Sequence, residues 1–214
     1  MRTLIVPLIL QSEWAAGLGL LTRFRETDYS SQLTRAYESL DLSVLYDSRL
    51  HGLGHIERVI LFGALIAWQE GLDARDTALL LAACSYHDIG RIDDSRDRAH
   101  GARSAEKLRG PAFRGLRASL AEADLLILLA AVAAHSLPDA FRAQIGKQLR
   151  VPAGETARYQ RLAACLKDAD GLDRVRLGDL DVSRLRRPCT AELVPFAEDL
   201  YYRYFLTHRE IYQY

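Results

Sequence analysis

The chain has 214 residues, of which 49% are hydrophobic and 26% are charged. This length suffices for one well-filled core and is short for two independent ones. Its 28 basic and 28 acidic residues balance, so the formal net charge is zero. A neutral chain has no general attraction for nucleic-acid polymers or anionic membranes, and an anionic ligand would be held by a local group of charges. We expect one domain over residues 1–214 and no nucleic-acid partner.

The N-terminal apolar run from Leu4 to Leu10 is broken by Pro7 and is too short to span a bilayer. It lacks a small-residue cleavage site, so we interpret it as a packing segment and not as a signal peptide. No other apolar stretch is long and uncharged enough to cross a membrane. The odd number of cysteines has no zinc-type spacing, which favours a cytoplasmic protein with packing thiols at Cys84, Cys165 and Cys189.

Apolar residues recur at intervals of three and four along nearly the whole chain, with little of the alternation typical of strands. This pattern predicts an all-α bundle. Ser119 and Glu122 have the spacing of a capping box, and Pro138 is expected to stop the helix that follows them. In chain order, we expect helices over residues 12–24, 30–40, 52–71, 74–90, 100–110, 119–135 and 156–177, and a last one after residue 190.

Histidines and aspartates gather on these apolar helices and at their ends. Imidazole and carboxylate are the ligands of borderline divalent metals such as zinc, iron, manganese, cobalt and nickel. A lone histidine at a helix end, such as His135, is more often hydrogen-bonded to a carbonyl. The pair His87 and Asp88 is more informative, because adjacent helical residues diverge by about 100° and share a target only where the helix ends. Gly90 supplies that end.

Three segments carry a family resemblance: HGLGHIERV at 51–59, YHDIGR at 86–91 and KDADGLDR at 167–174. In this order they resemble the HD-domain superfamily of metal-dependent phosphohydrolases. The resemblance implies a single helical bundle with a metal-binding core at about 51–175 and flanking helices at 1–50 and 176–214. It also implies four metal ligands, with Asp168 as the alternative for the last: His55, His87, Asp88 and Asp170.

The segment HGARSAE at 100–106 is similar to the region after the HD pair in family members with a second metal, including the HD-GYP phosphodiesterases. This similarity implies that His100 and His135 are further ligands, with Asp88 or Asp170 bridging. The alternative is that both histidines bind substrate phosphate or cap helices. The GYP motif is absent and Arg91 stands where lysine is common, so cyclic dinucleotides are not implied. The expected cofactor is one or two divalent transition metal ions, Mn, Fe, Co, Ni or Zn.

A metal held by imidazoles and carboxylates lowers the pKa of water and provides a nucleophile for phosphoester hydrolysis. We therefore expect an enzyme that hydrolyses a nucleotide or another small phosphorylated substrate. Arg58, Arg91 and Lys167 are candidate cations for the transition state. His51, four residues before His55, is a candidate proton donor or phosphate ligand.

Several other interpretations remain open at this point. Arg58 fits equally well in a salt bridge to Asp88 or Asp170. Inositol oxygenase and similar di-iron proteins of this fold use the same ligand order, so oxygen chemistry is the main alternative activity. A non-catalytic ligand-binding module is disfavoured because the ligand set is complete. The tyrosine-rich segment from residue 201 predicts either a helix packed over the bundle or a homodimer contact.

Overall fold

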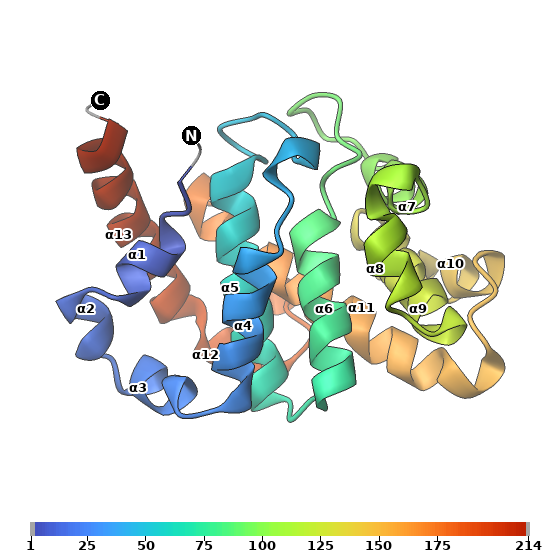
Figure 1. Ribbon diagram of the computed structural model, residues 1–214, viewed down its shortest axis with the longest axis horizontal. Helices are drawn as coiled ribbons and strands as arrows, with labels where there is room; N and C mark the ends of the chain where they lie inside the picture. Colours follow the sequence, from blue (N-terminus) through green and yellow to red (C-terminus); the bar gives the residue numbers. More distant parts are fainter. Residues whose placement is uncertain (1–2, 213–214) are drawn as a thin grey trace.

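The computed structural model describes residues 3–212, and within them every regular element is a helix (Figure 1). This confirms the predicted all-α fold. Short 3₁₀ turns connect several of the helices, including η5 (Asp173–Leu177). The α-helices are α1 (Val6–Leu10), α2 (Glu13–Ala16), α3 (Gly19–Arg25), α4 (Asp28–Glu38), α5 (Leu53–Gln69), α6 (Ala74–Tyr86), α7 (His100–Leu108), α8 (Arg114–Ala118), α9 (Glu122–His135), α10 (Arg142–Gln148), α11 (Thr156–Leu172), α12 (Pro188–Glu192) and α13 (Val194–Tyr212).

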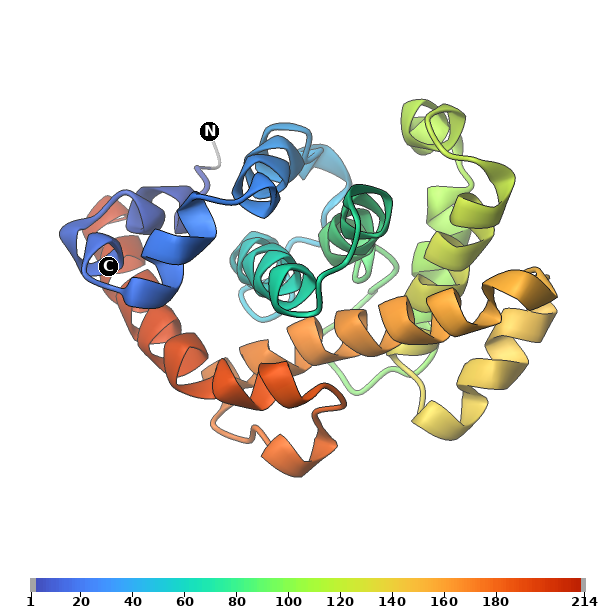
Figure 2. The same ribbon diagram turned by 90° about the horizontal axis from the view of Figure 1, so that it is seen from below.

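Helix α5 forms the centre of the bundle. Every residue from His55 to Ala67 is buried, so this helix is covered on all sides. Helix α6 packs beside it, α4 lies against both, and α11 crosses both from the other side (Figure 2). Helix α9 packs on α6, α7 and α11. This arrangement brings the first turns of α5 and α7 and the last turns of α6, α9 and α11 into one region.

Two glycines allow the close contacts that form this region. A Cβ atom at Gly90 would lie 2.4 Å from the His100 carbonyl oxygen, and one at Gly101 would lie 2.7 Å from the Val132 carbonyl oxygen. Contacts this short are not possible for a real side chain, so only glycine lets the turn after α6 meet α7 and lets α7 meet α9. The same two contacts bring the ends of these three helices together.

Helix α7 also holds the turn after α6 by hydrogen bonds. The Gly90 amide donates to Ser104 Oγ at 2.8 Å, and Arg103 Nε donates to the Gly90 carbonyl at 2.8 Å. Lys107 donates to the Ile89 carbonyl at 2.7 Å. The turn that contains the His–Asp pair is therefore fixed from one side by three side chains.

Several predicted helix limits are confirmed and others are wrong. Helix α5 ends before Gly71, and the Asp73 side chain caps α6 by accepting from the Asp76 amide at 2.7 Å. Helix α6 stops at residue 86 instead of 90, because the turn with the His–Asp pair begins there. The helix expected over 12–24 is two helices, separated at residues 17–18, and α10 was not predicted. The capping box is also wrong, because the Ser119 hydroxyl donates to the Leu116 carbonyl and caps nothing in α9.

The N-terminal apolar run packs as predicted. Ile5 and Val6 are buried, and α1 contacts α5 and α13. The side chains of Cys84 and Cys165 are buried, and all three cysteines are free thiols. Among the described residues, no helix is both long and apolar enough to cross a membrane.

Candidate metal centre

The six residues predicted as ligands come together where the helix ends meet. His55 lies in the first turn of α5, and His87 and Asp88 follow the end of α6. The other three lie at the start of α7, at the end of α9 and on α11: His100, His135 and Asp170. Five of them are buried, and the side chain of Asp170 is 35% exposed. Three overlapping groups of these side chains, one of which adds His51, have the spacing of metal ligands.

The histidines are oriented through their Nδ1 atoms. His87 Nδ1 is 2.9 Å from the Cys84 carbonyl oxygen, and His135 Nδ1 is 2.6 Å from the Val132 carbonyl oxygen. The His100 Nδ1 atom contacts the Asp97 carbonyl in the same way. A carbonyl only accepts hydrogen bonds, so each Nδ1 carries the proton, and in the neutral ring Nε2 keeps a lone pair. In all three cases, that lone pair points into the cluster.

The Nε2 atoms face each other in two close pairs. His55 Nε2 and His87 Nε2 are 3.1 Å apart, and His100 Nε2 and His135 Nε2 are 2.8 Å apart. Two lone pairs at such distances repel, so a proton or a cation is needed between them. Fixing Nδ1 on a second partner is also the usual way in which proteins orient histidines that bind metals. The histidine arrangement therefore fits a bound metal ion.

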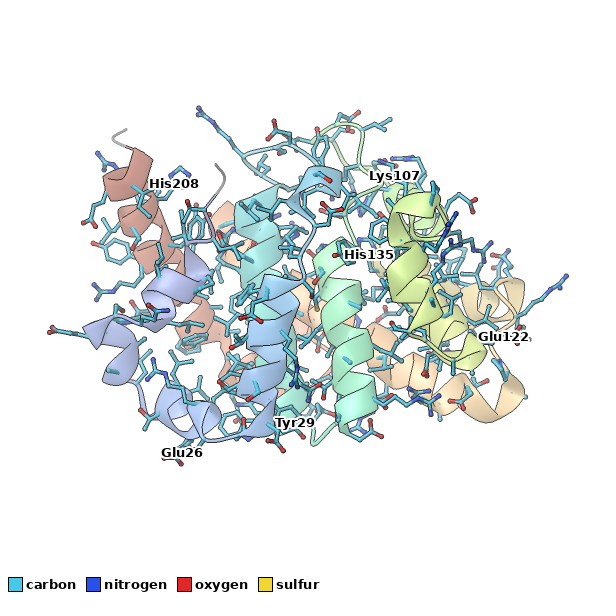
Figure 3. The ribbon with its side chains drawn as sticks, in the orientation of Figure 1. Glu26, Tyr29, Lys107, Glu122, His135 and His208 are labelled. Atoms are coloured by element: carbon cyan, nitrogen blue, oxygen red, sulfur yellow. The ribbon has the colours of Figure 1, made fainter. Side chains whose placement is uncertain are left out.

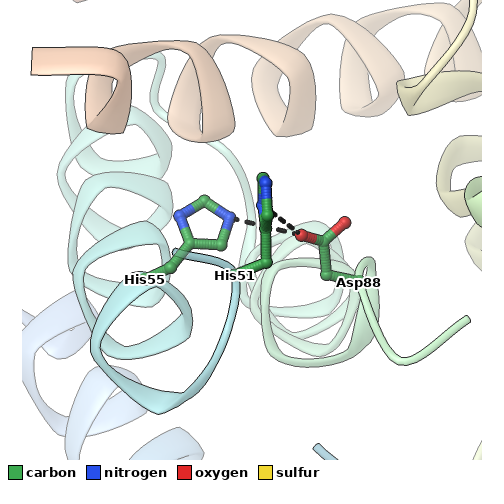
Figure 4. Close-up of side chains that lie close together, drawn as sticks. All are labelled: His51, His55 and Asp88. Carbon is green, nitrogen blue, oxygen red and sulfur yellow. Dashed lines mark ion pairs between the residues drawn. The ribbon is translucent and has the colours of Figure 1, made fainter. Parts of the chain in front are cut away.

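Asp88 lies between two groups of imidazoles. Its Oδ2 atom is 3.1 Å from His51 Nδ1 and 3.7 Å from His55 Nε2, as drawn in Figure 4. Its Oδ1 atom is 3.1 Å from His100 Nε2 and 3.5 Å from His135 Nε2. Nevertheless, no group among residues 3–212 donates a hydrogen bond to this buried Oδ1 atom. A buried oxygen without a donor is costly, and a metal ion at this position would satisfy it.

Asp170, and not Asp168, faces the cluster. Asp170 Oδ1 is 3.4 Å from His55 Nε2 and 3.8 Å from His87 Nε2. Asp168 is fully buried and accepts hydrogen bonds from the backbone amides of Arg186 and Arg187. Its carboxylate therefore holds the segment that leads into α12, and the geometry favours Asp170 as the last ligand.

Asp173 contacts one of the candidate ligands, a role that was not predicted. Its Oδ2 atom accepts from His55 Nδ1 at 2.8 Å, and Arg58 Nε donates to its Oδ1 at 2.6 Å. Arg176 Nη1 donates to the same carboxylate at 3.0 Å. Arg58 thus pairs with Asp173, and both predicted partners, Asp88 and Asp170, are wrong. Arg58 is therefore linked to the cluster through the carboxylate that contacts His55 Nδ1.

The remaining predicted site residues occupy different positions. Arg91 Nε donates to Asp88 Oδ2 at 2.7 Å, so its charge lies directly beside the cluster. The His51 Nδ1 atom lies 3.1 Å from the same oxygen. Lys167 instead donates to the Leu137 carbonyl and pairs with Asp139, just beyond the end of α9. These contacts favour a role for Lys167 in holding the end of α9.

Burial and local charges favour the protonation states in which these side chains bind metals, which are the neutral imidazole and the ionised carboxylate. Burial, assisted by the charge of Arg176, lowers the pKa of His55 to about 4, so its ring is neutral at pH 7. Burial opposes ionisation of Asp88, but the surrounding histidines outweigh it and hold the pKa of this carboxyl well below its ordinary value. The pKa of Asp173 is lowered as well, because Arg58 and His55 together outweigh burial.

The protein is thus a helical bundle whose helix ends gather histidines and aspartates with a spacing that could hold a metal ion. The HD domain family model matches residues 52–175, which is more than half of the chain. The protein therefore belongs to the HD domain family, as its sequence motifs indicated. Neither the curated proteins nor the solved structures include a significant match.

Proposed function

We propose that the protein is a metal-dependent phosphohydrolase that acts on a small phosphorylated substrate. The observation that carries the proposal is the position of Asp88, whose two oxygens face separate groups of imidazoles. We assign His55, His87, Asp88 and Asp170 to one metal ion. His100 and His135 would hold a second ion, with Asp88 as the ligand common to both. Bound ions would polarise a phosphoryl oxygen and lower the pKa of water.

The protein supplies the other requirements of phosphoryl transfer. Arg91 Nε is 2.7 Å from Asp88 Oδ2, and this positive charge at the edge of the cluster supports a role in stabilising the charge of a reacting phosphate. His51 is partly exposed, with 14% of its side chain accessible, whereas the His55 side chain is fully buried. His51 is thus the histidine best placed to exchange a proton with a leaving group and with solvent.

Metal analysis tests the proposal first. The chain is purified anaerobically without added metal, and bound metals are quantified by mass spectrometry in wild type, His87→Ala and His100→Ala. We expect about two ions per wild-type chain by the assignment above, loss of binding in His87→Ala, and one ion in His100→Ala. His208→Ala is the control, because His208 lies on α13 whereas His135 lies at the end of α9 (Figure 3).

Activity is then measured on p-nitrophenyl phosphate and bis(p-nitrophenyl) phosphate, which separate monoester from diester hydrolysis. Metal-dependent release of nitrophenol that is lost in His87→Ala supports the proposal. Absence of bound metal after purification and after titration would overturn it. Two iron ions with oxygen consumption and no ester hydrolysis would favour the alternative, a di-iron oxygenase with the same ligand order.

A further inference from the structure

A cavity of about 730 Å³ lies beside the candidate metal centre, outside the ligands assigned above. It is bounded by the first turns of α5, by residues 47–50 and by α13, and we call it the α5–α13 pocket. Its volume is in the range of pockets that bind small organic molecules. The lining residues that matter here are Arg49, Arg58, Arg176, Tyr201, Phe205 and Arg209.

Positive charge predominates in the α5–α13 pocket. Among the described residues that line it, four are arginines and one, Asp47, carries a carboxylate. Asp173, behind the wall, pairs with both Arg58 and Arg176, so one carboxylate is shared between two guanidinium groups. Burial lowers the pKa of His208, another lining residue, and nearby arginine charges lower it further. Arginines gathered in a partly buried pocket favour an anion with several oxygens, such as phosphate.

Aromatic rings alternate with these charges. The Arg58 guanidinium carbon lies 4.5 Å from the centre of the Tyr204 ring and 5.3 Å from that of Tyr201. The Arg209 guanidinium carbon lies 5.6 Å from the centre of the Phe205 ring. Guanidinium planes and tyrosine or phenylalanine rings both stack on flat ring systems. The lining therefore suits a ligand with a planar ring as well as an anionic group.

We propose that the α5–α13 pocket binds an organic anion in which a planar aromatic ring is joined to a phosphate-like group. Arg58 and Arg176 line the pocket, and both also donate to Asp173, which orients His55. A ligand in the pocket would therefore contact the two arginines that hold this carboxylate. The occupant is either the non-reacting part of the substrate or a separate effector. Binding at this pocket does not depend on the hydrolysis proposed above.

The proposal is tested on the full chain after metal is removed by a chelator, so that the probe has no metal to bind. The probe is (1-naphthylmethyl)phosphonate, which has a ring and a dianion but no ester bond to hydrolyse. Methylphosphonate supplies the anion alone, and 1-naphthalenemethanol supplies the ring alone. By isothermal titration calorimetry, we expect the complete probe to bind at least about tenfold more tightly than either part.

Surface variants locate the binding. Phe205→Ala and Arg49→Gln are each expected to weaken the probe at least about fivefold. Tyr202→Ala is the matched control for Phe205→Ala. Both rings lie on α13 and are similarly exposed, at 56% for Tyr202 and 48% for Phe205, but Tyr202 does not line the pocket. Arg114→Gln, an exposed arginine on α8, controls for loss of one charge. Equal weakening by the control variants, or a probe that binds no better than methylphosphonate, would overturn the proposal.

Kinetics of the metal-loaded protein distinguish whether the pocket binds part of the substrate or a separate effector. Inhibition by the probe that is competitive with a hydrolysed phosphoester would assign the pocket to the substrate. A change in kcat at constant KM would assign it to a separate effector, and both outcomes support the site. If the protein hydrolyses no phosphoester, the binding result on metal-free protein still stands, so failure of one proposal is distinguishable from failure of the other.

Discussion

Asp173→Asn removes the one negative charge that three cationic or polar groups share. Arg58 donates to this carboxylate at 2.6 and 3.0 Å, Arg176 donates at 3.0 Å, and His55 Nδ1 lies at 2.8 Å. The arginine side chains are 4% and 5% exposed, and Asp173 is fully buried. Asparagine has the same shape but no charge, so two buried guanidinium groups lose their counter-ion. Breaking a buried ion pair in this way costs roughly 3–5 kcal/mol of unfolding free energy.

The same substitution is expected to weaken metal binding. The carboxylate holds the His55 ring so that Nε2 faces the cluster, and loss of such a second partner typically costs about 10–100-fold in metal affinity. The unfolding free energy is measured by urea denaturation of the metal-free chain. Metal affinity is measured by competition with a chelator of known strength, on protein that is folded by circular dichroism.

Asp179→Asn is the matched control. Asp179 pairs with Arg174, but their side chains are 52% and 48% exposed, and an exposed pair contributes about 0–1 kcal/mol. We expect no change in metal affinity for this variant. If Asp173→Asn loses less than about 1 kcal/mol, or binds metal as tightly as wild type, then Asp173 does not position His55 as argued.

Three further variants test separate parts of the structure. Burial raises the pKa of Glu57 from 4.5 to about 7, so its contribution to stability is complete below pH 4.5 and is lost as the pH rises through 7. Between pH 5 and pH 8, urea denaturation should show wild type losing roughly 3 kcal/mol relative to Glu57→Gln, and parallel curves would contradict this. Asp168→Asn should destabilise by about 1.5–3 kcal/mol, because its carboxylate accepts backbone amides, and mass spectrometry should find unchanged metal content. Lys167→Gln should retain its metal and lose less than about tenfold in kcat, because Asp139 already pairs with the amine; a larger loss would restore Lys167 as a catalytic cation.

The position of His87 and Asp88 at a helix end could be predicted because its signal is local. A histidine next to an aspartate at a helix end, followed by Gly90, is visible in the sequence, and the structure shows why glycine is required there. The choice of Asp170 over Asp168 needs more than the motif. Both aspartates lie on α11, two residues apart. Only the structure shows that the Asp168 carboxylate accepts hydrogen bonds from the backbone amides of residues 186 and 187.

The partner of Arg58 could not be predicted from either segment alone. Arg58 follows His55 by three residues, and Asp173 follows Asp170 by three residues, so each pair shares one helix face. The two faces meet only because α5 and α11 cross in space. The failed capping box at Ser119 has a different cause, because the preceding short helix α8 uses that hydroxyl at its own end.

Parts of the chain outside the family match cover one side of the candidate metal centre. The match ends at residue 175, yet Arg176 donates to Asp173 and lies 3.5 Å from His51 Nδ1. Helix α13 lies beyond the match as well, and it contributes Tyr201 and Tyr204, the rings that stack on Arg58. In these two proposals, the residues assigned to metal all lie within the family match, whereas most of the residues that line the α5–α13 pocket come from the segments that flank it. By this argument, replacing α13 residues should change ligand preference while metal content stays constant.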